Sequence, residues 1–167
     1  MAEARRGEIV AAARDLLEEE GEAALTMRRL ADRLGIKAPS LYKHLPDKAE
    51  LEVALMSEGL EEFGHELRKA GQGLGALAGA YRAWALRHPH LYRLMTDRPL
   101  PRDRLPAGLE ARAAEPLLMA LRDPDRARAA WAAAHGLVSL ELAGRFPAEA
   151  DLDAAWSAMV RAFGPGE

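Results

Sequence analysis

The sequence predicts an all-α fold of about nine helices. Hydrophobic residues make up 49% of the 167-residue chain and charged residues 29%, which is enough apolar material for a buried core. Only 5% of residues are aromatic, and β-branched residues are scarce beside Ala, Leu, Arg and Glu. Alanine and straight-chain residues lose little side-chain freedom in a helix, so this composition favours helices over strands.

The first helix is predicted over residues 4–20. Gly21 follows three consecutive glutamates and closes this helix, because glycine readily adopts the left-handed conformation that ends many helices. The buried face of the helix carries apolar residues at helical spacing, namely Ile9, Val10, Ala13, Leu16 and Leu17.

Two short helices are predicted next. Thr26 is a good N-cap for a second helix over residues 27–34, which Gly35 ends. Pro39 suits the first turn of a third helix over residues 39–44, because the N–H that proline lacks would be unpaired there.

Six further helices complete the predicted fold. Asp47 caps a long helix that runs to about residue 70, where several glycines mark a break. The proline-rich residues 97–106 are expected to form a loop. The remaining helices are expected over about residues 74–87, 91–95, 107–122, 124–144 and 148–163.

Basic side chains are concentrated in one short segment. Between Thr26 and Lys48 lie six basic and two acidic residues, a net charge of +4 within a chain whose net charge is −3. Such a block suits a protein that contacts nucleic-acid phosphates through one small surface. The alternative interpretation is that these basic side chains lie on a helix face that contacts only solvent.

Several other classes of protein are not supported by the sequence. The chain has no cysteine, its first residues lack the apolar run of a signal peptide, and no stretch approaches the ~20 apolar residues that span a bilayer. A cytoplasmic protein without membrane association is therefore expected. No catalytic carboxylate pair, Ser-His-Asp grouping or phosphate loop is evident, so neither an enzyme nor a cofactor is expected. His88 and His90 flank Pro89, but no third ligand lies at a suitable spacing, so no metal site is predicted. The main alternative to the function derived below is a helical enzyme or a metal-binding helical bundle.

The spacing that a helix-turn-helix needs occurs in the stretch TMRRLADRLGIKAPSLYKHLPDK. Ala31 must be small because the next helix crosses close to it, and Gly35, four residues later, supplies the turn. The crossing angle is expected to depend on a small apolar core of Leu30, Leu34, Ile36 and Leu41. A unit of this kind presents its second helix to a DNA major groove.

Over this stretch the chain resembles the tetracycline-repressor (TetR) family of one-component regulators. The matching pattern is T-x-R-x-L-A-x-x-L-G-I from Thr26 to Ile36, then P-S-L-Y-x-H-L-x-x-K-x-x-L from Pro39 to Leu51. The chain departs from the common pattern at Lys37, where Ser or Thr is usual, and at Leu45, where Phe is usual. The resemblance implies a helix-turn-helix DNA-binding domain over residues 1–48 and a helical effector-binding and dimerisation domain over residues 49–167.

The resemblance also implies two kinds of DNA contact. Phosphate contacts, which set the register without reading the sequence, are expected from Thr26, Tyr42, His44 and Lys48. Base contacts are expected from exposed positions of the third helix, namely Lys37, Ala38, Ser40 and Lys43. Arg28 is placed to reach either a base or a phosphate. Packing of the Tyr42 ring on its own domain, and plain solvation of Lys43 and Arg33, stay open as alternatives.

The C-terminal part resembles one subclass of this family, which carries the signature W-x-x-x-H-G. Trp131, His135 and Gly136 match the signature, and YRAWALRHPHLYRLM resembles the helix that ends in a His-Pro pair in that subclass. Trp131 and His135 share one helix face because they are four residues apart. A pocket for a small hydrophobic or aromatic effector is expected from Phe63, Tyr81, Trp84, His88, Tyr92, Trp131 and His135. A filled core with one hydrogen-bonded histidine is the alternative.

The last two helices are expected to form a homodimer. Small residues allow close helix approach, and large ones supply buried area. The expected interface consists of Ala130, Ala134, Leu137, Val138, Trp156, Met159, Val160 and Phe163, although both helices could instead cover their own core. A twofold dimer sets two recognition helices about one DNA turn apart and predicts a palindromic operator. The predicted function is a repressor that a small effector releases from this operator, and the alternative is a ligand-independent or protein-partnered regulator of the same fold.

Overall fold

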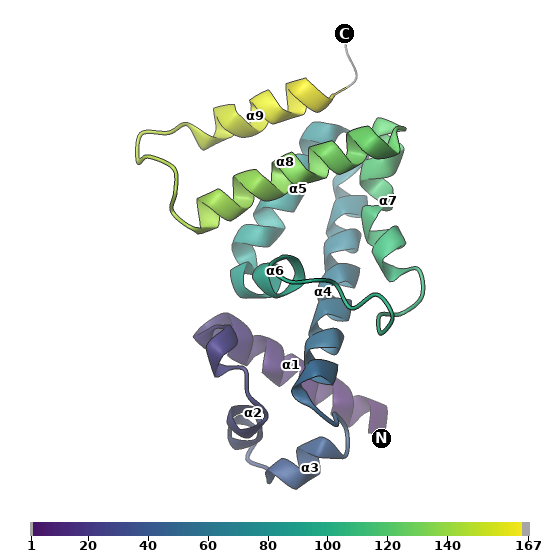
Figure 1. Ribbon diagram of the computed structural model, residues 1–167, viewed down its shortest axis with the longest axis vertical. Helices are drawn as coiled ribbons and strands as arrows, with labels where there is room; N and C mark the ends of the chain where they lie inside the picture. Colours follow the sequence, from purple (N-terminus) through teal and green to yellow (C-terminus); the bar gives the residue numbers. More distant parts are fainter. Residues whose placement is uncertain (1, 165–167) are drawn as a thin grey trace. The chain divides into compact units, whose positions relative to one another are not determined.

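The computed structural model describes residues 2–164, and this part of the chain is entirely helical, as predicted (Figure 1). It contains nine α-helices, one 3-10 helix and no strand. The helices are α1 (Ala2–Glu20), α2 (Met27–Arg33), α3 (Ala38–Tyr42), α4 (Lys48–Ala70), α5 (Leu74–Arg87), α6 (Pro89–Thr96), α7 (Leu109–Leu121), α8 (Pro124–Leu142) and α9 (Leu152–Phe163), with the 3-10 helix η1 at Glu22–Ala24. Among the described residues, no helix is both long enough and apolar enough to cross a bilayer.

The chain packs as two compact units. The N-terminal unit consists of residues 1–59 and 88–107, so α6 and the following loop pack with the first three helices. The C-terminal unit consists of residues 60–87 and 108–167, and in it α5, α7, α8 and α9 pack against one another. The predicted boundary at residue 48 separates a DNA-binding domain from an effector-binding domain by function, and this boundary stays a prediction.

The core of the N-terminal unit is built on the predicted face of α1. Ile9, Ala13, Leu16 and Leu17 are fully buried there, and Val10 is nearly so. The helix ends at Glu20, and Gly21 follows with φ +80° and ψ 175°. This is a positive-φ conformation that glycine adopts readily, although it is not the left-handed helical conformation that was expected.

Aspartate side chains cap three of the helices. Asp47 accepts the N–H of Glu50 at 2.7 Å before α4, as predicted. Asp123 accepts two N–H groups at the start of α8. Asp151 accepts the N–H of Ala154 at 2.9 Å, so α9 begins at Leu152. The predicted start near residue 148 is therefore wrong, because a turn precedes this cap.

Helix α7 contains Pro116 at a buried position within the helix. A proline has no N–H to donate to the carbonyl four residues earlier, which is that of Arg112. Arg68 on α4 donates to this carbonyl at 3.1 Å, so a side chain replaces the missing helical hydrogen bond. Pro116 is thus accommodated within a continuous helix.

Candidate nucleic-acid interface

Hydrogen bonds fix the start of α2 and the turn between α2 and α3. The Thr26 hydroxyl accepts the N–H of Arg29 at 3.1 Å, which confirms Thr26 as the N-cap of α2. Gly35 has φ +63°, and the N–H of Ile36 donates to the carbonyl of Ala31 at 3.0 Å. The bond from Ile36 to Ala31 ends α2 and redirects the chain into α3.

A small apolar core holds the two helices at their crossing. Leu30 and Leu41 are fully buried and Ala31 is 2% exposed, whereas Leu34 and Ile36 are half-buried. A side chain larger than that of Ala31 has little room there. Leu45 is also fully buried, so a leucine fills the position at which the family commonly has a phenylalanine.

The outer side of α3 is not covered by the rest of the N-terminal unit. Ser40, Tyr42 and Lys43 are exposed, with Tyr42 at 47%, while Ala38 and His44 are half-buried. Lys37 stands at the N-cap of α3 but forms no side-chain cap; its carbonyl accepts the N–H of Ser40 at 2.9 Å. The side chain of Lys37 is therefore available for an external partner.

The six basic residues of the segment divide into two groups of three. Arg28, Lys37 and Lys43 form no ion pair with any described residue and are exposed. Lys48 lies 3.4 Å from a Glu52 carboxylate oxygen, and Arg29 and Arg33 pair with glutamates at the end of α1. The glutamate run at the end of α1, next in sequence to this basic segment, is the sequence signal from which these pairs could have been predicted.

Three of the seven residues predicted to line an effector pocket lie together in the C-terminal unit. The ring of Phe63 meets the rings of Tyr81 and Trp84 edge-on, with both centroid distances 5.2 Å. Trp84 is fully buried, and its indole N–H donates to Glu62 at 3.0 Å. The three rings thus form one packed cluster.

The other four predicted pocket residues are not part of this ring cluster. His88 and Tyr92 belong to the N-terminal unit, where the His88 Nδ1 lies 3.4 Å from an Arg14 guanidinium nitrogen. Trp131 is 51% exposed and lies 6.3 Å from the half-buried ring of His135.

Tyr81 and Trp131 border one small pocket of the C-terminal unit, together with apolar residues such as Leu67 and Met159. Its volume of about 30 Å³ is far below the ~300 Å³ at which ligand pockets usually begin. A larger open groove of about 410 Å³ lies between α5 and α9 and is lined by none of the residues predicted for the pocket.

Most residues predicted for the dimer interface pack inside the subunit itself. Five of them are buried and three are half-buried, namely Ala130, Ala134, Val138, Trp156 and Met159 in the first group and Leu137, Val160 and Phe163 in the second. Val160 and Phe163 pack against a core cluster that includes Leu74 and Ala130. The hydrophobic face predicted as an interface therefore covers the subunit's own core. The exposed face of these two helices carries small and apolar residues, namely Ala129, Ala132, Leu140, Ala154, Ala158 and Ala162.

A helix-turn-helix with an uncovered recognition helix, followed by a helical domain, defines a class of DNA-binding regulators. Residues 9–55 match the family described as bacterial regulatory proteins, tetR family, and residues 74–163 match the tetracyclin repressor-like C-terminal domain. The chain therefore belongs to the tetracycline-repressor (TetR) family of transcriptional regulators.

Two curated relatives place the chain within this family. An uncharacterized HTH-type transcriptional regulator of Mycobacterium tuberculosis is 34% identical over 170 residues, which cover 93% of this chain and 78% of the relative. The class A tetracycline repressor of Escherichia coli is 46% identical over 54 residues, 32% of this chain and 25% of that protein.

Two solved structures share the fold over nearly the whole chain. A protein with unknown function from Rhodococcus sp. RHA1 has 25% identity and a TM-score of 0.80, with 95% of this chain and 92% of that chain covered. A TetR variant from Acinetobacter baumannii in complex with minocycline has 27% identity and a TM-score of 0.68, with 94% and 92% covered.

Proposed function

We propose that this regulator is a homodimeric repressor that reads a palindromic operator with the outer side of α3. The observation that carries the proposal is the contrast along this helix, where Leu41 is fully buried while Ser40, Tyr42 and Lys43 are exposed. Lys37 and Lys43 supply donors for base edges, and Ser40 and Ala38 supply short side chains that allow close approach. The DNA backbone would be contacted by Thr26, Arg28, Tyr42, His44 and Lys48, which would set the register, and Arg28 could instead contact a base.

The test is a selection of operator DNA from a random pool, followed by binding assays with variants. Lys37→Gln and Lys43→Gln should each weaken operator binding by about tenfold, equivalent to ~1.4 kcal/mol. Lys69→Gln, which removes an exposed cation from the end of α4, is the matched control and should bind like the wild type. Wild-type affinity for both α3 variants would exclude this helix as the reading element.

Dimerisation is assigned to the outward faces of α8 and α9. The small side chains Ala129, Ala132, Ala158 and Ala162 are exposed on these helices and would allow two copies to pack closely as a four-helix bundle. Trp131 and Leu140, at 51% and 45% exposure, would supply the apolar area at the edge of this bundle. A twofold axis through this interface would present two α3 helices to successive turns of a palindrome.

The effector would be a small hydrophobic or aromatic molecule that binds among the aromatic residues of the C-terminal unit. The complex of a related TetR variant with minocycline supports a ligand site in this fold. The pocket beside Tyr81 and Trp131, about 30 Å³, would have to open, so the ligand would select a less populated conformation. Operator affinity would then fall by the ligand's preference for that conformation.

The alternative is a ligand-independent or protein-partnered regulator, and the tight packing of Phe63, Tyr81 and Trp84 favours it. Apolar compounds added to the operator-bound protein distinguish the two. Release by at least one compound of a broad panel supports effector control, and unchanged binding across the panel supports the alternative.

The remaining assignments follow from the sequence. Trp131, His135 and Gly136 support membership of the W-x-x-x-H-G subclass. We place the protein in the cytoplasm as a regulator without enzymatic activity, with its DNA-binding domain over residues 1–48 and its effector domain over residues 49–167.

A further inference from the structure

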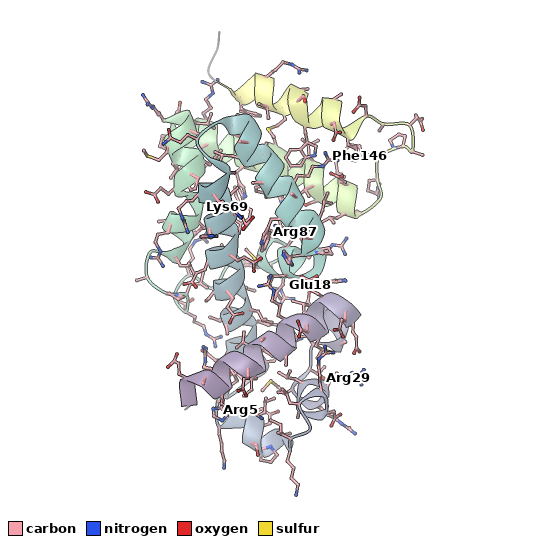
Figure 2. The ribbon with its side chains drawn as sticks, turned by 180° about the vertical axis from the view of Figure 1, so that it is seen from behind. Arg5, Glu18, Arg29, Lys69, Arg87 and Phe146 are labelled. Carbon is pink, nitrogen blue, oxygen red and sulfur yellow. The ribbon has the colours of Figure 1, made fainter. Side chains whose placement is uncertain are left out.

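Two arginines of α2 are held by two glutamates at the end of α1. One of these arginines, Arg29, is labelled in Figure 2. Arg29 donates to Glu20 through Nη2 at 2.9 Å and through Nε at 3.2 Å. Arg33 donates to Glu19 through both terminal nitrogens, at 2.7 and 2.8 Å. Both contacts are bidentate, which fixes the direction of each guanidinium group.

These arginines lie on the helix that borders the proposed DNA surface. Arg29 is in the first turn of α2, and its N–H donates to Thr26, a proposed phosphate contact. Arg33 is the last residue of α2, next to the turn that leads to Lys37. Without the glutamates, the exposed unpaired cations of the segment from Thr26 to Lys48 would rise from three (Arg28, Lys37 and Lys43) to five.

Extra cations on such a surface strengthen binding to any DNA sequence. Phosphate neutralisation releases counterions and supplies most non-specific affinity, whereas base contacts supply discrimination. A regulator that must find one operator among many competing sites depends on the ratio of these affinities. An arginine that contacts phosphate on any DNA, and makes no base contact, therefore lowers the ratio of operator affinity to non-specific affinity.

We propose that Glu19 and Glu20 determine specificity by holding Arg33 and Arg29 away from DNA phosphates, which limits sequence-independent affinity. The proposal rests on the interface assigned to α3. The hydrogen bonds from Arg33 lower the pKa of Glu19, so this carboxylate stays charged at neutral pH. Exposed ion pairs add little to stability, so their removal leaves the fold intact and exposes the effect on binding.

The experiment measures binding to a duplex of arbitrary sequence, about 30 base pairs long, by fluorescence anisotropy between about 50 and about 200 mM salt. In the double variant E19Q/E20Q, two freed arginines per subunit, four in the proposed dimer, should steepen the log-log salt slope by about 3.6. Affinity should then fall about 150-fold more across that range than in the wild type. Each single variant should show about half of this change in slope.

Two further variants separate freed arginines from a general loss of negative charge. R29Q/R33Q should keep the wild-type slope, because these arginines are already neutralised. The fourfold variant E19Q/E20Q/R29Q/R33Q should return to the wild-type slope. A flatter slope in R29Q/R33Q, or a slope that stays steep in the fourfold variant, would overturn the proposal.

A wrong assignment of the DNA-binding surface to α3 would give a different result. In that case Lys37→Gln and Lys43→Gln would bind the operator as tightly as the wild type, whatever the salt slopes of the glutamate variants. Thermal unfolding of every variant checks that the helical fold is retained.

Discussion

Leu91 donates its backbone N–H to the Glu18 carboxylate at 3.0 Å, which joins the first turn of α6 to α1. The N–H of His90 donates to the other oxygen of the same carboxylate at 3.3 Å. The first N–H groups of a helix have no partner within it, and a negative charge at this end is favourable. A single side chain of α1 thus caps a helix about 70 residues further along the chain.

Replacement of this carboxylate should weaken the N-terminal unit. Glu18→Ala is expected to lower the free energy of unfolding by about 0.5–2 kcal/mol, as for loss of other N-caps, because the two N–H groups lose their acceptor. Thermal and urea unfolding followed by circular dichroism provide the measurement. Glu61→Ala removes an exposed glutamate of α4 and should unfold like the wild type. Equal unfolding of the two variants would show that the cap contributes nothing.

The crossing of α2 and α3 depends on a small residue at position 31. Ala31→Leu adds three carbons at a position that is 2% exposed, and such overpacking costs about 1–3 kcal/mol. Because α3 must move to make room, operator affinity should fall by more than about tenfold even where the protein remains folded. Operator titration together with thermal unfolding tests this, and Ala49→Leu at an exposed position of α4 is the control. Unchanged operator affinity in the Ala31 variant would refute the crossing as the determinant of α3 placement.

Features that depend on neighbours along the chain could be predicted from the sequence. Gly21, Thr26 and Asp47 each end or begin a helix through contacts within four residues, and the structure confirms each of them. The stripe of buried residues on α1 follows in the same way from helical periodicity.

Contacts between distant segments could not be predicted in this way. Periodicity shows which face of a helix is buried but not what covers it. The apolar faces that carry Val138 and Met159 were therefore compatible both with a partner subunit and with the subunit's own core. The capping of α6 by Glu18 and the pairing of Arg33 with Glu19 involve charged residues, which periodicity assigns only to solvent. Both arise from the packing of α1 on other helices.

Helices α4 and α7 approach each other closely at Gly64. A Cβ atom at this position would lie 3.0 Å from the Ala113 Cα, a backbone atom that cannot turn aside. Gly64→Ala should therefore destabilise the protein by about 1–3 kcal/mol, despite the better helix propensity of alanine. Gly79→Ala on α5 meets no atom within 4 Å and should stabilise the protein by about 0.5–1 kcal/mol. Chemical unfolding measures the change in the free energy of unfolding for both variants. A stabilising effect of Gly64→Ala would contradict the close approach of α4 and α7.

The proposed dimer should be sensitive to charge on the outer faces of α8 and α9. Ala132→Glu or Ala158→Glu would place carboxylates from two subunits near one another without solvent, so the protein should become monomeric. Sedimentation velocity measures the state of assembly at several concentrations. Ala114→Glu makes the same change on the exposed side of α7 and should leave the dimer intact. A dimer that survives both substitutions on α8 and α9 would place the interface elsewhere.

Arg82 links three helices of the C-terminal unit. Its guanidinium donates to Glu141 on α8 at 2.7–3.2 Å and to Asp153 on α9, and it lies 5.8 Å from the centre of a Trp156 ring. The Glu141 side chain is only 14% exposed, so loss of Arg82 leaves a carboxylate with poor access to water. Arg82→Ala should destabilise the protein by about 1–3 kcal/mol, whereas Arg128→Ala breaks an exposed pair and should cost less than about 1 kcal/mol.

The double variant Arg82→Met with Glu141→Leu tests the cause of this loss. Replacing both partners of a shielded ion pair by apolar side chains is often neutral, because no charge is left without a partner. The double variant should therefore be more stable than Arg82→Ala in urea unfolding. If it is equally destabilised, the contribution of Arg82 comes from its contacts with Asp153 and Trp156, and the Glu141 carboxylate is sufficiently hydrated on its own.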